Sequence, residues 1–224
     1  MPKCSTWVVK LGGSLIGTPA LPRWLDAIAE AGSGHRIIVV PGGGLFSDAV
    51  REAQNRLQFD DAVAHRMAMQ GMQQFGWALN ALMGALSASG LTGLADILAG
   101  DSDRGVWIWD PCDPRLVGSD LPEDWRVTSD SLSLWLCGEI EDSSLLLVKS
   151  RTPTGDASDV RGLAGESFVD EYFPVLWRDI DRPAWWLTAD QSTALESLLA
   201  GRPMHDHAIA GNRRSGNRSE VSSQ

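Results

Sequence analysis

The sequence has little positive charge, few cysteines and no long hydrophobic run, and each of these absences excludes a class of protein. Nineteen basic residues against 29 acidic ones give a net charge of −10, and the lysines and arginines form no basic stripe. Because binding to a phosphate backbone depends on clustered positive charge, we expect no nucleic-acid partner. No segment approaches the roughly 18 unbroken apolar residues of a membrane span, and no signal-peptide core follows the first residues. We therefore expect a cytoplasmic protein without membrane contact.

The three cysteines, Cys4, Cys112 and Cys137, are widely spaced and form neither a CxxC pair nor another metal-like spacing. We interpret them as reduced thiols, either packed or at the surface. A His-Asp-His run at residues 205–207 superficially suggests a metal site. The alternation of the terminal strand that we expect there leaves these histidines without a third ligand. The sequence therefore predicts no protein-bound metal.

The chain has 224 residues, of which 43% are hydrophobic and 21% charged. These values are typical of a globular protein with one substantial core. We therefore predict a single α/β domain over residues 1–210. Residues 211–224 are rich in Ser, Asn, Arg and Gly, and we expect a disordered tail there. The ten tryptophans are interpreted as core or interface packing.

Two buried strands are expected near the start of the chain, and each ends in a glycine-rich turn. Residues 7–11 form an apolar run that stops at the glycines of residues 12–14, and residues 36–40 form another that stops at residues 41–44. An amphipathic helix over residues 22–31 joins the two strands. This order predicts a βαβ unit of a parallel sheet.

The same periodicity arguments predict further helices and strands along the chain. Helices are expected over 46–57, from Asp60 or Asp61 to a stop near Gly90, and over 132–137, 169–172 and 189–199. Strands are expected over 106–109, 144–150 and 184–188, with a last one near 207–210, and loops over 111–122 and 151–166.

Both glycine-rich turns lie where a buried strand ends, which is the edge at which α/β proteins bind ligands. Because glycine has no side chain, the backbone amides of these turns can approach and bind phosphate oxygens there. Neither turn matches the dinucleotide or P-loop pattern. Lys10, in the first strand, would be a costly buried charge unless a partner compensates it, and a phosphate would do so. The alternative is that Lys10 extends to solvent at the strand end.

Three motifs in this order resemble the amino acid kinase family, which includes acetylglutamate, glutamate, aspartate, uridylate and isopentenyl phosphate kinases. The motifs are Val9–Ser14, Val39–Gly44 and Thr128–Ser131, followed by the strand Leu145–Ser150. The resemblance covers roughly residues 5–210. It implies a three-layer α/β/α sandwich with a mainly parallel open sheet. Residues 1–125 would bind the phosphoryl acceptor, residues 126–210 would bind ATP with Mg²⁺, and the chain would form a homo-oligomer.

The resemblance also implies roles for individual residues. Lys10 would stabilise charge on the transferring phosphoryl group, and Asp130 would position Lys10; these two are the expected catalytic residues. Phosphate binding is expected at Gly12, Gly13 and Ser14, and substrate binding at Gly42, Gly43, Gly44 and Asp48. Nucleotide binding is expected at Lys149, Ser150, Asp170 and Tyr172, with the amine of the acceptor as an alternative partner for Asp170. Family members often carry a lysine late in the nucleotide half, and since none follows Lys149 here, Lys149 or Arg151 would replace it.

Within the family, the short chain and the segment Val169–Phe173 resemble the small kinases of methanofuran-type cofactor synthesis. Those enzymes phosphorylate an aminomethylfuran phosphate to its diphosphate. Another acceptor is the alternative: UMP, isopentenyl phosphate or an acyl carboxylate, which Arg51 or Arg66 could hold. His65 could reach the acceptor, but a packed or exposed histidine is the preferred interpretation, since the sequence shows no partner for it. A non-catalytic nucleotide- or anion-binding protein is the alternative from another class.

Overall fold

The computed structural model describes residues 6–84, 87–100, 102–116 and 119–209, and both Cys4 and the predicted tail lie outside them. The described chain forms one six-stranded sheet in the order β3-β4-β2-β1-β5-β6, with every neighbouring pair parallel. The strands are β1 (Thr6–Leu11), β2 (Arg36–Pro41), β3 (Ser87–Thr92), β4 (Gly105–Trp109), β5 (Ser143–Lys149) and β6 (Ala184–Thr188).

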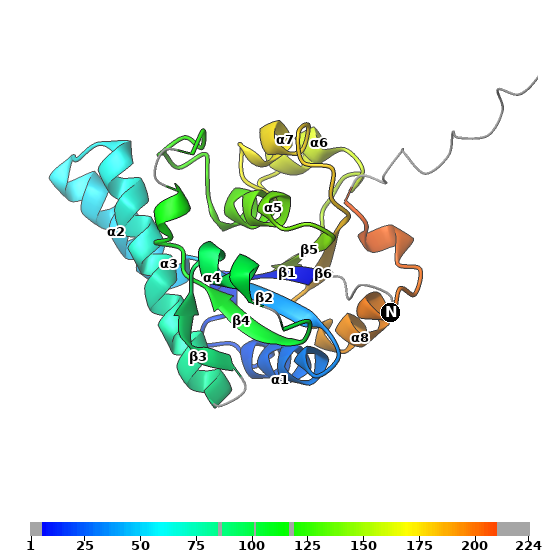
Figure 1. The fold of residues 1–224 in the computed structure, drawn as a ribbon. Helices are drawn as coiled ribbons and strands as arrows, with labels where there is room; N and C mark the ends of the chain where they lie inside the picture. Colours follow the sequence, from blue (N-terminus) through cyan, green and yellow to red (C-terminus); the bar gives the residue numbers. More distant parts are fainter. Residues whose placement is uncertain (1–5, 85–86, 101, 117–118, 210–224) are drawn as a thin grey trace, which may run out of the picture.

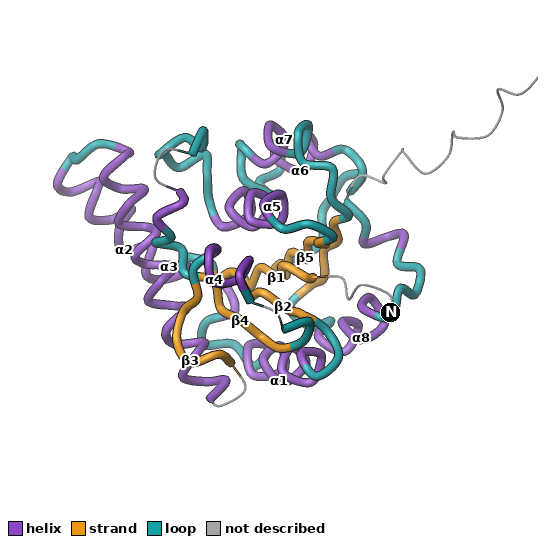
Figure 2. The backbone as a smooth tube through the Cα atoms, in the orientation of Figure 1, coloured by secondary structure: helices purple, strands orange, loops and turns teal. Residues whose placement is uncertain are grey.

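Helices cover both faces of this sheet (Figures 1 and 2). They are α1 (Ala20–Gly32), α2 (Gly44–Leu57), α3 (Asp61–Met83), α4 (Leu94–Ala99), α5 (Ser129–Glu139), α6 (Val160–Gly165), α7 (Phe173–Leu176) and α8 (Leu195–Leu199). Short 3₁₀ turns are η1 (Gly13–Leu15), η3 (Pro114–Leu116), η4 (Ser192–Ala194) and η5 (His205–His207). Figure 1 shows α5, α6 and α7 on one face and α1 and α8 on the other, while α2 and α3 pack against each other beside β3. The predicted α/β/α sandwich with a parallel open sheet is confirmed.

Alternate residues of the central strands face two separate cores. Val8 of β1 and Leu145 of β5 belong to the core under α5, whereas Val9 and Leu146 belong to the core under α1. Strands buried on both faces read as unbroken apolar runs, which is why the sequence located β1, β2 and β5. Because side chains alternate along a strand, Lys10 projects on the same side as Val8, toward α5.

The secondary-structure prediction was wrong for the region after α3. The long helix was expected to stop near Gly90, but it ends at Met83, and Gly84 leaves it with φ 58°. Gly90 instead lies inside β3, which pairs with β4 at one edge of the sheet. β3 reads SASGLT, and small residues and glycine are poor strand formers, so the pattern gave no signal. The helix α4 was missed in the same region.

Two expectations in the C-terminal half were also wrong. Residues 169–172 form an irregular loop, and helices lie on either side of it as α6 and α7. The strand expected near residues 207–210 is replaced by η5 and one antiparallel bridge between Ala208 and Trp185. A single bridge at the sheet edge requires no alternating pattern, so the sequence could not distinguish it from a strand. The division of the domain into two binding halves stays a prediction, since one sheet carries strands from both.

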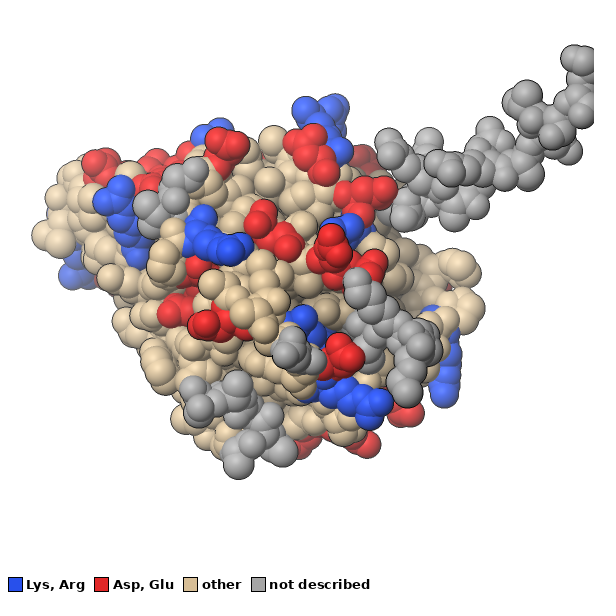
Figure 3. All heavy atoms as spheres, in the orientation of Figure 1, with Lys and Arg blue, Asp and Glu red and all other residues tan. Residues whose placement is uncertain are grey.

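Charges are mixed on the surface. On the face drawn in Figure 3, acidic and basic side chains are interspersed, and the basic ones form no continuous stripe. Within the described residues, no helix combines the length and the apolar character that a membrane crossing requires.

Candidate active site

The predicted site residues converge on the carboxyl ends of three neighbouring strands. β1 lies between β2 and β5, and Leu11 is paired with Pro41 on one side and with Val148 on the other. The glycine turns that follow β1 and β2 are therefore adjacent, and Lys149 at the end of β5 lies beside them. This is the edge of a parallel sheet at which ligands bind.

The two glycine turns pack backbone against backbone. A Cβ on Gly13 would lie 2.1 Å from the amide nitrogen of Gly44, and a Cβ on Gly42 would lie 2.6 Å from that of Gly13. Gly44 also has φ 50°, in the left-handed region. From the sequence, we attributed these glycines to the close approach of a phosphate to the backbone. The structure adds a second reason, since no side chain fits between the turns.

Lys10, Asp130 and Lys149 form a buried cluster of charges above this edge. Asp130 lies in the first turn of α5, with its Oδ1 3.2 Å from Lys10 Nζ and its Oδ2 2.8 Å from Lys149 Nζ. The side chains of Lys10 and Asp130 are each 9% exposed. The partner that compensates the buried Lys10 is thus a carboxylate of the same chain. Oδ1 of Asp130 nevertheless accepts no hydrogen bond of good geometry, so this contact with Lys10 is a charge contact.

The cluster shifts the titration of its members. Burial raises the pKa of Asp130, but the ammonium groups of Lys10 and Lys149 together outweigh burial and hold that pKa below its ordinary value. Burial lowers the pKa of Lys149 to about 8, with Lys10 adding to the effect and Asp130 opposing it. Asp130 is therefore ionised at neutral pH, and the cluster carries two positive charges around one negative charge.

Of the two candidates for the second cation, Lys149 reaches the cluster and Arg151 does not. Arg151 donates from Nη2 to the carbonyl oxygen of Glu166 over 2.5 Å, and Glu166 also accepts from the amide of Thr154 over 2.9 Å. These contacts hold the loop after β5 in place. Lys149 and Arg151 both lie over the ring of Phe168, at 5.1 and 5.6 Å from its centroid.

The other predicted site residues differ in their solvent exposure. Ser14 and Ser150 are exposed beside the glycine turn and the end of β5, while Asp48 is exposed on α2. Tyr172 is partly buried and donates its backbone amide to the carbonyl oxygen of Arg126. The carboxylate of Asp170 is occupied by donors of this chain, from Thr128, Ser131 and Phe173. The structure therefore offers no support for Asp170 as a nucleotide ligand.

A cavity of about 220 Å³ lies between α3, the segment after β4 and α5. Its polar lining includes His65, Arg66 and Glu123, and Met69 and Leu132 are among its apolar walls. Leu132 lies two residues after Asp130, so the cavity reaches α5, the helix that carries Asp130. None of the described residues 42–48 lines this cavity.

The segment before α5 is fastened across α2 and α3, which the sequence did not reveal. Trp125 donates from Nε1 to Gln54 Oε1 over 2.7 Å, and the guanidinium of Arg51 lies 3.6 Å from the centroid of its ring. His65 Nδ1 lies 3.2 Å from the carbonyl oxygen of Asp124. The presence of Trp125 in a polar loop was the one signal in the sequence for these contacts, because a tryptophan ring in a loop needs a specific partner to pack against.

Burial lowers the pKa of His65, against the opposing effect of the Asp124 carbonyl. The imidazole is therefore neutral at pH 7, and since a carbonyl oxygen only accepts, Nδ1 carries the proton. Arg66, which pairs with Glu123 at 2.9 Å, supplies the positive charge at the cavity.

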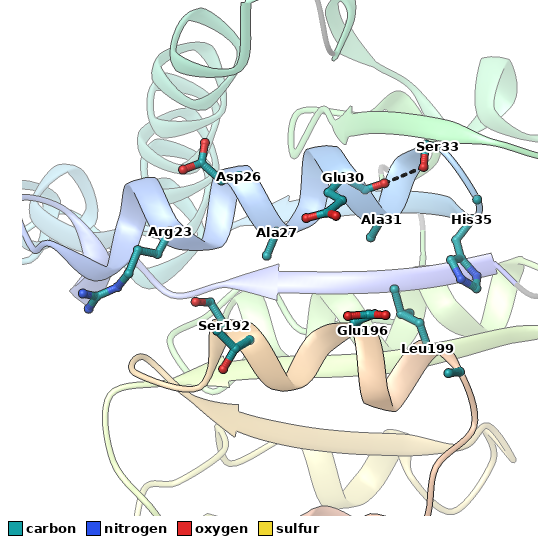
Figure 4. A pocket seen from close by; sticks show the side chains of 13 residues that line it. Arg23, Asp26, Ala27, Glu30, Ala31, Ser33, His35, Ser192, Glu196 and Leu199 are labelled. Atoms are coloured by element: carbon teal, nitrogen blue, oxygen red, sulfur yellow. Dashed lines mark hydrogen bonds between the residues drawn. The ribbon is translucent and has the colours of Figure 1, made fainter.

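A second hollow, of about 670 Å³, lies between α1 and the segment 192–200. Figure 4 shows Glu30 on one side of it, Glu196 on the other and His35 at one end. It lies on the α1 side of the sheet, opposite α5 (Figure 1). None of the predicted site residues lines it. The described residues contain no group of three or more His, Cys, Asp or Glu side chains suited to a metal ion.

Two sequence comparisons show what this chain is similar to. The model of the amino acid kinase family matches residues 5–106. The [5-(aminomethyl)furan-3-yl]methyl phosphate kinase of Methanocaldococcus jannaschii is 27% identical over 211 residues, covering 87% of this chain and 93% of that enzyme.

Solved structures agree on the fold. Uridylate kinase from Archaeoglobus fulgidus superposes with a TM-score of 0.67 at 11% identity, covering 87% of this chain and 95% of that one. UMP kinase from Bacillus anthracis superposes with a TM-score of 0.66 at 14% identity, covering 91% and 93% of the two chains. Such low identities establish the shared architecture alone. The family model over residues 5–106, the relative along most of the chain and the shared sandwich make this chain similar to the amino acid kinase family.

Proposed function

We propose that this protein is an ATP-dependent kinase that phosphorylates an aminomethylfuran phosphate to its diphosphate, in the synthesis of a methanofuran-type one-carbon cofactor. The observation that carries the proposal is the buried cluster in which Asp130 holds both Lys10 and Lys149. The relative from Methanocaldococcus jannaschii, by its name, supports the choice of acceptor.

The charges of the cluster suit phosphoryl transfer. The ammonium of Lys10 lies beside the first glycine turn, since a Cβ on Gly12 would be 3.5 Å from its Nζ. Lys149 supplies a second positive charge on the other side of Asp130. Transfer of a phosphoryl group depends mainly on alignment and on stabilising the charge that spreads over its oxygens. Two ammonium groups fixed by one carboxylate provide both.

The transfer leaves the protein unmodified. The bond between the terminal phosphorus of ATP and its bridging oxygen breaks, and that phosphorus bonds to a phosphate oxygen of the acceptor. ADP departs with the bridging oxygen. The attacking oxygen of a phosphate monoester is already largely anionic near pH 7, so the step needs no strong base. This agrees with a role for Asp130 as an orienting group whose pKa is low.

ATP fits the residues at the strand ends. We propose that its phosphates bind beside Gly12, Gly13 and Ser14, where Lys10 and Lys149 supply positive charge. Ser150 and Tyr172 are the further nucleotide-binding residues that we propose beside Lys149. Mg²⁺, when bound with ATP, shields the phosphate oxygens. We propose that these oxygens hold it.

The 220 Å³ cavity is the proposed site for the furan end of the acceptor. It is smaller than the pockets of about 300–1,000 Å³ that hold drug-sized ligands, which suits a small ring. Met69 and Leu132 provide apolar walls, and the ion pair of Arg66 with Glu123 forms a polar side of the cavity. Gly42, Gly43, Gly44 and Asp48 remain the proposed acceptor-binding residues beside the first turn.

The homo-oligomer expected from the family stays a proposal. Trp77 and Leu82 of α3 support it, because their side chains are 53% and 64% exposed and large apolar residues on a surface favour an interface.

ADP release with MgATP across a panel of acceptors tests the proposed function. The panel contains aminomethylfuran phosphate, UMP, isopentenyl phosphate, glutamate and acetylglutamate, and Lys10→Ala is the control. We expect turnover on aminomethylfuran phosphate and its loss in Lys10→Ala. Turnover on another acceptor alone would refute the choice of substrate. Measurable ATP binding with no turnover on any acceptor would favour a non-catalytic nucleotide-binding protein.

A further inference from the structure

Asp170 is the centre of a hydrogen-bond network that joins two segments of the chain, residues 128–131 and residues 170–173. Its carboxylate accepts from the amide and the hydroxyl of Thr128 over 2.8 Å each, from the amide of Ser131 over 3.0 Å and from that of Phe173 over 3.0 Å. The hydroxyl of Ser131 also donates to it. Five donors thus surround one side chain, which leaves it little capacity for a ligand.

The network caps the helix α5 from a distant part of the sequence. Thr128 is the N-cap residue of α5, but its own side chain does not cap the helix. The first amides of a helix have no partner within the helix and require an outside acceptor. Asp170, 39 residues beyond Ser131, is that acceptor, and its negative charge also suits the positive end of the helix.

Asp130 lies in the turn that Asp170 holds, between Thr128 and Ser131. Its Oδ1 accepts no hydrogen bond of good geometry, so hydrogen bonds of its own do not fully fix its carboxylate. The backbone of the turn must therefore set its position between Lys10 and Lys149.

We infer that Asp170 is a positioning residue of the proposed phosphoryl transfer: it clamps the first turn of α5 and thereby sets where Asp130 holds the two lysines. The inference rests on the proposed kinase function, and it replaces the nucleotide contact expected for Asp170 from the sequence. A displacement of about 1 Å in a catalytic group lowers a rate on the order of 10²-fold, which gives such a clamp a large effect.

The network also carries an electrostatic signature that a purely structural contact lacks. The charged groups that act on Lys149 are Asp130 of α5, Lys10 of β1 and Asp170, and the last raises the pKa of Lys149. Arg151 lies over the same Phe168 ring as Lys149. Loss of the charge on Asp170 therefore lowers the pKa of Lys149 and moves the basic limb of kcat/KM to lower pH.

The test compares Asp170→Asn with Glu171→Gln in the full chain. Asn keeps the shape of Asp170, but its amide group removes the charge and turns an N–H toward one of the donors. Glu171 is the adjacent exposed carboxylate, so Glu171→Gln controls for charge. We expect Asp170→Asn to lower kcat about 10-fold to 100-fold and to leave the Kd of MgATP within about twofold. The basic limb of its kcat/KM profile should move to lower pH. Glu171→Gln should change none of these.

An increase in the Kd of MgATP with unchanged kcat would overturn the inference, because it would place Asp170 on the nucleotide. Unchanged kcat and Kd would overturn it as well. If Asp170→Asn does not fold, Ser131→Ala removes one donor and should lower kcat in the same direction by a smaller factor; an unchanged kcat there would contradict the clamp.

Hydrogen exchange separates this inference from the proposed function. In Asp170→Asn, the amides of Thr128 and Ser131 should exchange faster than in wild type and in Glu171→Gln, whether or not any acceptor is phosphorylated. Faster exchange with no turnover in wild type would leave the clamp in place, refute the proposed kinase and with it the catalytic part of the inference. Unchanged exchange would refute the clamp itself.

Discussion

Lys149 donates a hydrogen bond from Nζ to Oδ2 of Asp130 over 2.8 Å, at the point where the last residue of β5 meets the first turn of α5. Lys10 approaches the other oxygen of the same carboxylate. A buried carboxylate that orients two ammonium groups leaves a local excess of positive charge, which an anionic ligand would neutralise.

Replacing Lys149 by Met should abolish most of the activity while the fold is retained. Met has a similar unbranched chain without the charge, and one charge that stabilises a transition state contributes about 10²- to 10³-fold to kcat. The measurement is steady-state kcat with MgATP, with Lys149→Arg as the control that keeps the charge. Equal kcat in wild type and Lys149→Met would show that Lys149 takes no part in the reaction.

The activity should fall as the pH rises through about 8. Lys149 has a pKa lowered by burial to about 8, and only its protonated form carries the charge that the reaction uses, so the loss of its proton produces a basic limb. The profile of kcat/KM reports this pKa in the free enzyme. In Lys149→Arg, whose guanidinium stays protonated, the limb should move to higher pH. A limb at the same pH in both proteins would assign the titration to another group.

Gly13→Ala should destabilise the protein because the two glycine turns are in backbone contact. The added Cβ would lie 2.1 Å from the amide nitrogen of Gly44, so one turn must move, and overpacking of this kind costs about 1–3 kcal/mol. Gly165→Ala is the matched control, since no atom lies within 4 Å of its Cβ and Ala favours a helix. Chemical denaturation measures both free energies of unfolding. Equal stability of Gly13→Ala and wild type would contradict the packing of the turns.

The strands and glycine turns could be predicted from the sequence because their signals are local. β1, β2 and β5 are continuous apolar runs, and Lys10 is conspicuous as a charge within one of them. Asp130 was located through its motif. β3 was missed because its small residues carry no strand pattern, and its place at the sheet edge depends on pairing with β4.

The contacts around Asp130 could not be predicted, because they join residues that lie far apart along the chain. The sequence predicted Asp170 as a ligand-binding carboxylate, whereas in the structure this carboxylate accepts hydrogen bonds from five donors of the same chain. The choice between Lys149 and Arg151 also required the structure. Lys149 ends β5 and reaches Asp130, whereas Arg151 lies beyond the strand and donates to the carbonyl oxygen of Glu166. The contact of Trp125 with Arg51 also required the tertiary structure.

Replacing Trp125 by Ala should weaken acceptor binding more than ATP binding. The ring holds the segment before α5 against Arg51 and Gln54, and that segment contributes Glu123 to the 220 Å³ cavity. We expect the KM of the acceptor to rise about 10-fold, corresponding to about 1.4 kcal/mol. Trp125→Phe keeps an aromatic ring for Arg51 but lacks the Nε1 donor, and should give a smaller rise. An equal rise in the KM of ATP would mean that the segment does not belong to the acceptor site.

Mass spectrometry of the product formed from aminomethylfuran phosphate and MgATP is the most direct test of the proposed kinase. The wild-type protein should yield a species heavier than the acceptor by one HPO₃ group, in equal amount to the ADP released, and Lys10→Ala should yield none. An unchanged acceptor in the presence of wild-type protein that binds MgATP would contradict the proposed reaction.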